Sequence, residues 1–368
     1  MRVLVVNAGS SSLKLRLLDE HDTLAGRADL GPVDDLPADD LRRALDGVGA
    51  FDAVGHRVVH GGERFREPVV VDHAVRRRLA DLTTLAPLHQ PGSLAALDAV
   101  TAAAPDVPAI ACFDTAFHAT LRPEAGVFAV PAAWRRELGL RRYGFHGLSH
   151  AYAARRAAEV VLADGDPPGR MVTCHLGAGA SLAAVHEGMS VDTTMGFTPL
   201  DGLVMATRSG SVDPGAVLWL VEHCGLDPGE VSDALEHRSG LLGLAGSADM
   251  ATVVERADAG DEAAGLAIAV YQHRLRAGIA TMAAALAGVD VLVFTGGVGE
   301  NAPTVRASAV SGLPFLGVAI DATANAAVDL DASGGVADVG LTGAPARVLV
   351  VAAREDLEIA RGVRALLA

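Results

Sequence analysis

The chain repeats one local pattern twice, and this repeat constrains the fold more than any other feature. Residues 3–17 and 171–185 each contain an apolar strand, a polar residue, a glycine-containing turn and a second apolar strand. Asn7 then matches His175 and Gly9 matches Gly177, and we expect the second turn to be one residue longer. Two similar halves, each with a turn whose amides can bind an anion, predict a nucleotide between paired α/β domains. The alternative is that glycine-rich strand ends are simply common in α/β proteins.

A third glycine-rich stretch follows the apolar residues 290–295. It reads Gly296-Gly297-Val298-Gly299-Glu300-Asn301 and precedes a helix-prone segment. We interpret it as a third turn that ends a strand, with amides placed near a helix N-terminus, where anions bind well.

Lysine occurs once, at Lys14, although the chain has 30 lysines and arginines in total. Lys14 comes directly after the loop Asn7-Ala8-Gly9-Ser10-Ser11-Ser12 and Leu13, between two predicted strands. A compact ammonium in a chain that otherwise uses arginine suggests a phosphate contact. The full phosphate-loop pattern GxxxxGK[ST] is absent, so a surface hairpin with an incidental lysine remains the alternative.

Length and composition predict two domains with mainly aliphatic cores. Half of the 368 residues are hydrophobic, and only 4% are aromatic. We place the boundary near residues 148–152, and predict helices over 151–162, 263–286 and 355–367. The last helix is amphipathic, with Leu357, Ile359, Val363 and Leu366 as its apolar contacts, and could pack on the first domain.

Charge and cysteine content exclude several classes of function. The net charge of −15 argues against nucleic acid and anionic membranes as partners. Cys112, Cys174 and Cys224 are far apart and odd in number, which argues against a disulfide framework or structural zinc. No export segment follows Met1-Arg2, so we expect a cytoplasmic protein.

Four short strings carry the candidate chemistry. They are Gly55-His56-Arg57-Val58-Val59-His60-Gly61-Gly62, Phe113-Asp114-Thr115-Ala116-Phe117-His118, residues 143–150 (YGFHGLSH) and residues 207–214 (TRSGSVDP). A carboxylate after a strand, such as Asp114, commonly binds Mg²⁺, and arginines supply positive charge for phosphate oxygens. The lone histidines could instead be structural, and His56 with His60 could resemble a metal pair.

Together and in this order, the strings resemble the acetate kinase family of the acetate and sugar kinase, Hsp70 and actin superfamily. The resemblance also includes LAPLH, HLGAGAS, GGVGEN and REDLEIA, and spans essentially the whole chain. It implies an α/β fold of two ribonuclease H-like (actin-like ATPase) domains with duplicated βββαβαβα cores. The domains would be residues 1–150 plus 355–368 and residues 151–354, with ATP or ADP in the cleft between them and a homodimer formed through the second.

The resemblance implies a role for each matching residue. Arg57 and Arg208 would hold the acetate carboxylate and the transferred phosphoryl group, and His146 would bind that group. Asn7, Asp114 and Glu355 would position or bind Mg²⁺, with Mn²⁺ as a substitute. Val59, Leu88, Phe145 and Pro199 would form the pocket for the acetate methyl. The catalytic set is Arg57, Asp114, His146, His175 and Arg208, and the nucleotide set is Asn7, Ser10, Ser12, Lys14, His175, Leu176, Gly177, Ala178, Gly179, Asp249, Met250, Ala251, Gly297, Val298, Gly299, Glu300 and Asn301.

This chain departs from the family pattern at several positions. Ala178 replaces the usual asparagine of HLGNG, and Ala251 replaces the arginine of SxDxR. The second change leaves Asp249 for the ribose but removes a guanidinium that could cover the base, so we expect weaker or less selective nucleotide recognition. Ala206 for glycine and Gln90 for asparagine are smaller changes near the acetate side.

Four other functions are alternatives to this one. Propionate or butyrate kinases would differ only in pocket volume, which the sequence does not settle. A kinase for a sugar hydroxyl would use Asp114 as a base, but the apolar pocket residues argue against a polyol. A noncatalytic switch of the actin or Hsp70 type would not need the arginine pair. A dinucleotide-dependent dehydrogenase is disfavoured because no GxGxxG follows the first strand.

Overall fold

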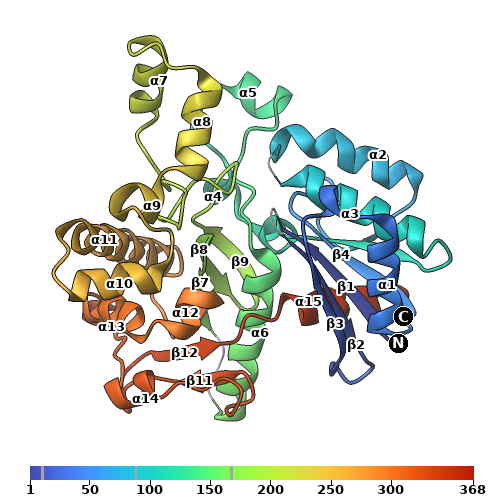
Figure 1. The fold of residues 1–368 in the computed structure, drawn as a ribbon. Coiled ribbons are helices and arrows are strands. Elements are labelled where there is room, and N and C mark those ends of the chain that lie inside the picture. The colour runs from blue at the N-terminus through green and yellow to red at the C-terminus, as the bar shows by residue number, and fades with distance from the viewer. Residues whose placement is uncertain (10–11, 88, 166–168) are drawn as a thin grey trace. The chain divides into compact units, whose positions relative to one another are not determined.

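The computed structural model describes residues 1–368 except 10–11, 88 and 166–168. The chain forms two compact units (Figure 1). The first contains residues 1–119, 145–152 and 354–368, and the second contains residues 120–144 and 153–353. No helix in the described part of the chain is long and apolar enough to cross a membrane.

The sheet of the first unit has six strands among the described residues, in the order β3-β2-β1-β4-β6-β5. The strands are β1 Val3–Ala8, β2 Leu13–Leu18, β3 Leu24–Leu30, β4 Ala53–Val58, β5 Val69–Val70 and β6 Ala109–Phe113. β1, β4 and β6 are parallel neighbours, whereas β2, β3 and β5 pair antiparallel. The carboxyl ends of β1, β4 and β6 therefore lie at one edge of the sheet.

Helices cover both faces of this sheet. α1 Ala38–Val48 and α3 Gln90–Ala103 pack on one face, and α15 Glu355–Leu367 packs on the other. α2 His73–Asp81 packs against α3, and short 3₁₀ helices cover Val33–Asp35, Leu82–Leu85 and Ala116–Thr120. α15 thus belongs to the first unit although it ends the chain, as we predicted. Of its predicted apolar contacts, Ile359 and Val363 are buried and Leu357 packs against them partly buried, whereas Leu366 is 42% exposed and is not a core contact.

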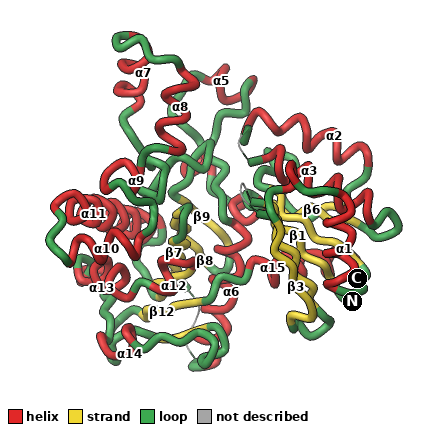
Figure 2. The backbone as a smooth tube through the Cα atoms, in the orientation of Figure 1, coloured by secondary structure: helices red, strands yellow, loops and turns green. Residues whose placement is uncertain are grey.

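The second sheet repeats the first. Its order is β11-β12-β10-β7-β8-β9, so each sheet has two antiparallel strands on one side of its first strand, two parallel strands on the other, and a short antiparallel edge strand. Figure 2 shows the strands of both sheets in yellow. The strands are β7 Arg170–Leu176, β8 Ala180–His186, β9 Met189–Thr193, β10 Val291–Thr295, β11 Val336–Asp338 and β12 Arg347–Val351. This repeat confirms the predicted duplicated α/β fold.

The helices of the second unit include the long α11 Glu262–Ala285, which packs on β7, β8 and β9. α6 Gly147–Ala163 begins in the first unit and ends in the second. The others are α4 Pro123–Gly126, α5 Ala132–Glu137, α7 Pro214–Glu222, α8 Pro228–His237, α9 Gly240–Ala245, α10 Met250–Asp258, α12 Gly296–Asn301, α13 Pro303–Ser311 and α14 Ala322–Ala326, with a 3₁₀ turn at Pro314–Leu316.

Two local expectations are corrected. β1 ends at Ala8, paired with Leu13, and β7 ends at Leu176, paired with Ala180, so the second turn is one residue shorter than the first, not longer. The predicted third turn is helical, since residues 296–301 form α12 directly after β10.

The predicted boundary also differs from the compact units at residues 120–144. We placed this segment in the first domain, but it packs with the second unit. Arg142 explains the attachment, because its Nη1 donates to the carbonyl oxygens of Thr193, Thr194 and Met195 at 3.0, 3.0 and 2.9 Å. The backbone N–H of Tyr143 adds a hydrogen bond of 2.9 Å to the carbonyl of Gly196.

Candidate active site

Four predicted site residues meet at the carboxyl edge of the first sheet. Asn7 is the penultimate residue of β1, Arg57 is the penultimate residue of β4, Asp114 follows β6, and Glu355 begins α15. The strand register places the side chains of Asn7 and Arg57 on the sheet face that α15 covers. Lys14 pairs with Asn7 in the register, and its exposed side chain shares this face. The parallel strand order therefore brings together Asn7, Arg57 and Asp114, and the packing of α15 on the same face adds Glu355.

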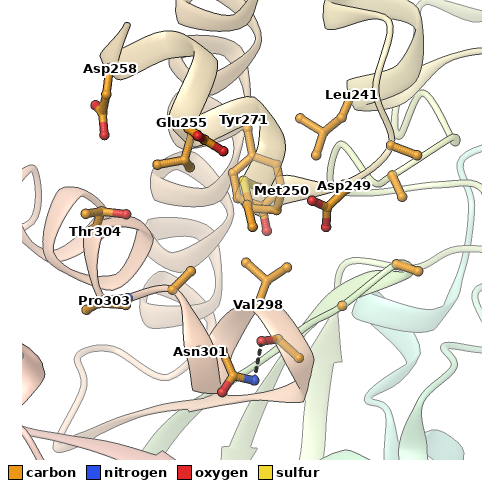
Figure 3. Close-up of a pocket in the computed structure, with 18 residues that line it drawn as sticks. Leu241, Asp249, Met250, Glu255, Asp258, Tyr271, Val298, Asn301, Pro303 and Thr304 are labelled. Atoms are coloured by element: carbon orange, nitrogen blue, oxygen red, sulfur yellow. Dashed lines mark hydrogen bonds between the residues drawn. The ribbon is translucent and has the colours of Figure 1, made fainter. Parts of the chain in front are cut away.

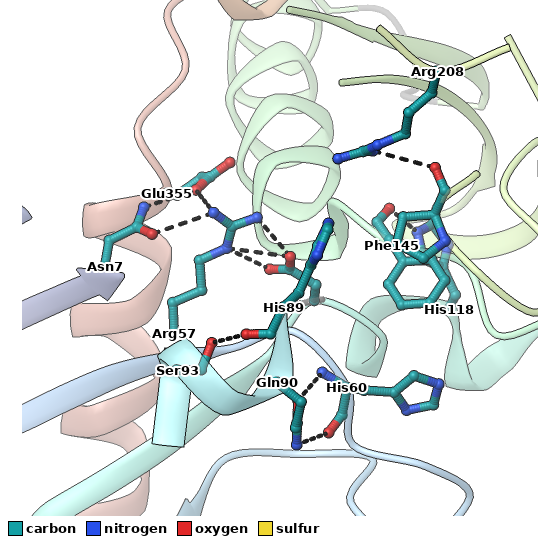
Figure 4. Close-up of polar contacts among 12 residues, drawn as sticks. Asn7, Arg57, His60, His89, Gln90, Ser93, His118, Phe145, Arg208 and Glu355 are labelled. Carbon is teal, nitrogen blue, oxygen red and sulfur yellow. Dashed lines mark hydrogen bonds and ion pairs between the residues drawn. The ribbon is translucent and has the colours of Figure 1, made fainter. Parts of the chain in front are cut away.

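Arg57 is the centre of this group (Figure 4). Its Nε donates to Asp114 Oδ1 at 3.0 Å and its Nη2 to Asp114 Oδ2 at 2.6 Å, so the pairing is bidentate. Its Nη1 donates to Asn7 Oδ1 at 3.2 Å and lies 3.8 Å from Glu355 Oε2. Asn7 Nδ2 in turn donates to Glu355 Oε2 at 3.4 Å.

Charge governs the protonation of Arg57. Burial alone lowers the pKa of its guanidinium, but the carboxylates of Asp114 and Glu355 and the hydrogen bonds to Asp114 outweigh burial and raise the pKa above its usual value. Arg57 is therefore a permanent cation held rigidly between two carboxylates. A planar fork suits this bidentate geometry better than an ammonium would.

The oxygens around Arg57 fit a hard divalent cation. Two carboxylates and one amide oxygen converge there, and such oxygens are the ligands that Mg²⁺ prefers. The two carboxylates and one guanidinium leave a local charge of −1 at this point, which also suits a cation. Within the described residues, no three histidine, cysteine, aspartate or glutamate side chains lie close enough together to hold a metal ion. A metal site here would therefore need the amide oxygen of Asn7 in addition to the two carboxylates.

The segment after Gly144 is fastened to Asp114. Gly147 N donates to the carbonyl of Asp114 at 2.8 Å, and a Cβ on Gly147 would lie only 2.2 Å from that oxygen. Only glycine allows this approach. His146, just before it, has a left-handed backbone with φ of 56°, and is partly exposed. Thus the predicted catalytic histidine sits on a constrained turn that is hydrogen-bonded to the backbone of Asp114.

Two of the predicted pocket residues are buried in the first unit. Val59 is 7% and Phe145 is 1% exposed, and the ring of Phe145 contacts the ring of His60 edge-on at 5.5 Å. A ring nitrogen of His118 donates to the carbonyl of Phe145 at 3.0 Å.

Two of the predicted site residues, Leu88 and Ser10, lie outside the described residues. Ser12 lies in the turn after β1, where its carbonyl accepts from Gly9 N at 2.8 Å.

His56 and His60 do not form the metal pair that their spacing could suggest. His56 is 1% exposed, and neither of its ring nitrogens has a hydrogen-bond partner among the described residues. Burial lowers the pKa of His56 to about 4, so it is neutral at physiological pH. His60 Nδ1 accepts from Gly62 N at 2.8 Å. The side chain of Gln90 binds the backbone of His60 twice: its Oε1 accepts from His60 N, and its Nε2 donates to the His60 carbonyl, both at 3.1 Å. Gln90 is therefore a structural residue of this loop.

In the second unit, Arg208 is held by a loop and a buried acid. Its Nη1 donates to the carbonyl of Pro199 at 3.2 Å, and its Nε lies 3.2 Å from Glu236 Oε2. Burial lowers the pKa of Arg208 and raises the pKa of Glu236, while their mutual attraction opposes both shifts. The sequence offered no sign that Glu236, on α8, is the partner of Arg208.

A pocket of about 730 Å³ lies in the second unit (Figure 3). Eight predicted nucleotide residues line it: Gly177, Ala178, Asp249, Met250, Ala251, Gly297, Val298 and Asn301. They come from the turn after β7, from the start of α10 and from α12. Ala206 N donates to the carbonyl of Ala178 at 3.1 Å, which fastens the first of these segments.

The other predicted nucleotide residues of this unit, His175, Leu176, Gly179, Gly299 and Glu300, do not line the pocket. Glu300 has a structural role, because its Oε1 accepts from Gly296 N at 3.0 Å and from Ala353 N at 2.9 Å. Asp249 caps α10, with Oδ2 accepting from Thr252 N at 2.9 Å and from the Thr252 hydroxyl at 2.7 Å. Those bonds lower the pKa of Asp249, led by the bond from the hydroxyl. Sequence reasoning missed the lining residues Leu241, Val254, Glu255, Asp258, Tyr271, Ala302, Pro303 and Thr304.

Comparison with known proteins identifies the family. Residues 33–361 match the acetokinase family. The chain belongs to the acetokinase family. It is 44% identical to acetate kinase from Leifsonia xyli, an alignment that covers 98% of this chain and 97% of the relative.

Two solved structures match this chain over nearly its whole length. The crystal structure of Porphyromonas gingivalis acetate kinase matches with a TM-score of 0.90 and 34% identity, and covers 100% of both chains. A propionate kinase from Francisella tularensis matches with a TM-score of 0.87 and 33% identity over 98% of each chain. The family predicted from the short motifs is thereby confirmed, together with the fold.

Proposed function

We propose that this chain is an ATP-dependent acetate kinase, which reversibly transfers the γ-phosphoryl group of ATP to acetate, giving acetyl phosphate and ADP. The observation that carries the proposal is the convergence of Asn7, Arg57, Asp114 and Glu355 in a member of the acetokinase family. The two compact units would be its domains, and the second would form a homodimer in the cytoplasm.

The acceptor needs no general base. A carboxylic acid with a pKa of about 4 to 5 is already ionised at neutral pH, so its oxygen can attack phosphorus directly. The obstacle is repulsion, since two unit charges about 4 Å apart cost roughly 4 kcal/mol at an effective dielectric constant of about 20. Positive charge at the site is therefore the main requirement for catalysis.

Arg57 and Arg208 would supply this charge to the acetate carboxylate and to the phosphoryl oxygens, and His146 would donate a hydrogen bond to the transferred group. The bonds of Arg57 to Asp114 and Asn7 fix its orientation before substrate arrives. Lys14 and Ser12 would contact the phosphates, as would Ser10. Asn7, Asp114 and Glu355 would hold Mg²⁺ or Mn²⁺, which neutralises phosphate charge when bound.

The nucleotide would bind in the pocket of the second unit. Its lining includes the turn at Gly177 and Ala178 and the start of α12 at Gly297 and Val298, and its volume of about 730 Å³ is typical of a small-molecule site. His175 and Gly179 would contact phosphate from the same turn. We propose direct in-line transfer without a phosphoenzyme: a chirally labelled γ-phosphoryl group should show inversion, and retention would contradict direct transfer.

Propionate is the second candidate acceptor. The Francisella tularensis propionate kinase is 33% identical to this chain, and the Porphyromonas gingivalis acetate kinase is 34% identical. One methylene is worth only about 1 to 3 kcal/mol of discrimination in an apolar pocket. Initial rates of ADP formation with acetate, propionate and butyrate test the choice: the highest kcat/KM with acetate supports the proposal, and a higher value with propionate would replace it. ATP turnover that no acid stimulates would point instead to a nucleotide switch.

A further inference from the structure

The wall of the pocket in the second unit contains a buried tyrosine. Tyr271, on α11, is 3% exposed, and its side chain lines the pocket. Figure 3 shows it extending from α11 into the space that Asp249, Met250 and Val298 surround. Its hydroxyl is buried and has no hydrogen-bond partner among the residues that the structure describes. Buried polar groups are nearly always hydrogen-bonded, so this hydroxyl needs an explanation.

The charges around the pocket indicate which part of a ligand it suits. The charged side chains of its lining, Asp249, Glu255 and Asp258, are all acidic, and no lysine or arginine of the described chain lines it. Leu241, Val254 and Val298 add apolar surface. These acidic side chains would repel the phosphates of a nucleotide, whereas its uncharged base and ribose would fit.

We propose that the Tyr271 hydroxyl is a hydrogen-bonding group for the nucleoside part of the nucleotide. This inference rests on the proposed function, and adds a binding residue to it. Burial raises the pKa of Tyr271, so the hydroxyl stays protonated and can both donate and accept. Because a hydroxyl rotates, it can accept from an exocyclic amino group or donate to a carbonyl. Tyr271 therefore strengthens binding of purine nucleotides without selecting sharply between them.

Access to the hydroxyl requires a small movement of a lining side chain. Met250 begins α10, which packs on α11, and is 6% exposed at the pocket. Methionine is unbranched and flexible, so it can change rotamer at little cost. The nucleoside would displace Met250 and then complete the hydrogen bond that Tyr271 lacks.

Tyr271→Phe is the direct test, because it removes one oxygen and keeps the ring. The matched control is Tyr143→Phe, which removes a hydroxyl that donates to the carbonyl of Gly139 at 3.0 Å. Dissociation constants of ADP and GDP would be measured by titration calorimetry, and unfolding by urea without ligand. We expect Tyr271→Phe to weaken both nucleotides by about 3- to 10-fold, the effect of one lost neutral hydrogen bond, and to leave the ligand-free protein as stable as wild type or more stable. Tyr143→Phe should do the opposite, lowering stability and leaving nucleotide binding unchanged.

The outcomes separate this inference from the proposed function. If wild type binds ADP and Tyr271→Phe binds it equally well, the inference is wrong and the kinase proposal stands. If Tyr271→Phe lowers stability as Tyr143→Phe does, with no change in affinity, the hydroxyl has only a structural role. Failure of wild type to bind either nucleotide would overturn both proposals.

Discussion

The guanidinium of Arg57 binds the carboxylate of Asp114 with two nitrogens, at 3.0 and 2.6 Å, across the carboxyl ends of two adjacent parallel strands. Asp114 is only 2% exposed, and the Arg57 side chain is 20% exposed. The pair is thus mostly withdrawn from water, while one edge of the guanidinium still faces Asn7 and Glu355. We expect both the stability of the fold and the proposed catalysis to depend on this arrangement.

Replacing Arg57 by alanine should lower both stability and activity. The change leaves the buried Asp114 carboxylate without its cation, which costs about 3 to 5 kcal/mol, and removes transition-state charge, which should lower kcat about 10²- to 10³-fold. Arg57→Lys should have a stability and a kcat between those of wild type and Arg57→Ala, because an ammonium keeps the positive charge but cannot form the bidentate pair. Urea unfolding and initial rates measure the two effects.

Arg76 provides a matched control for that experiment. It binds Asp98 through Nε and Nη2 at 2.7 and 2.6 Å, but Asp98 is 52% exposed. Arg76→Ala should change the free energy of unfolding by less than about 1 kcal/mol and leave kcat unchanged. Equal unfolding midpoints for the two alanine variants would contradict our account of Arg57.

Gly147→Ala should damage the site through the backbone. The new Cβ would lie 2.2 Å from the Asp114 carbonyl oxygen and 2.9 Å from Phe117 Cβ, so the chain around His146 or Asp114 must shift. We expect a loss of about 1 to 3 kcal/mol in stability together with a lower kcat. Gly47→Ala on α1 is the control, since nothing lies within 4 Å of its Cβ, and it should be neutral or slightly stabilising. A fully active Gly147→Ala enzyme would show that this contact does not position the site.

His56 should make the protein less stable in mild acid. Burial lowers the pKa of His56 to about 4 in the folded state, compared with about 6.5 in the unfolded chain. Between these values the unfolded state binds the extra proton, so stability falls as the pH drops from 6.5 to 4 and His56 contributes no further loss below that. His56→Leu should reduce this slope, while His21→Gln, at an exposed position, should not. Urea unfolding midpoints at pH 7 and pH 5 measure this loss of stability for each variant. The same loss in His56→Leu as in wild type would contradict the prediction.

Nucleotide selectivity should be low. Ala251 lines the pocket where the family pattern has arginine, and Asp249 is occupied in part by capping α10. One missing polar contact corresponds to about a tenfold change, so we expect kcat/KM for ATP, GTP and ITP to agree within about tenfold. Ala251→Arg should increase the preference for one base. A sharp preference of the wild type for ATP would show that other residues select the base.

Periodicity and short motifs predicted much of the architecture. The repeat of residues 3–17 and 171–185 predicted two related α/β halves, and both sheets have the same strand order. Arg57 and Asp114 were predicted from their places at the ends of predicted strands, and such positions converge in parallel sheets. Glu355, and the metal role of Asn7, were predicted only from the resemblance to the acetate kinase family.

Other features depend on packing that local sequence does not encode. Residues 120–144 pack with the second unit because Arg142 binds three carbonyls of the 193–195 segment, and no motif marks that contact. Glu300 looked like a nucleotide residue within a glycine-rich string, but its carboxylate binds two backbone amides. Tyr271 lies in an alanine-rich helix whose pattern indicates only burial. Hydrogen bonds decide the first two cases, and the packing of α11 beside the pocket decides the third.

The most direct measurement is acid-dependent formation of an acyl phosphate. The purified protein would be incubated with ATP, Mg²⁺ and acetate, and the product trapped with hydroxylamine, in parallel with Arg57→Ala, Arg208→Ala and the control Arg76→Ala. Our account predicts acetyl hydroxamate from wild type and Arg76→Ala, and a loss of at least about 10²-fold in the other two. Absence of hydroxamate from wild type with acetate, propionate and butyrate, while ADP still binds, would contradict it.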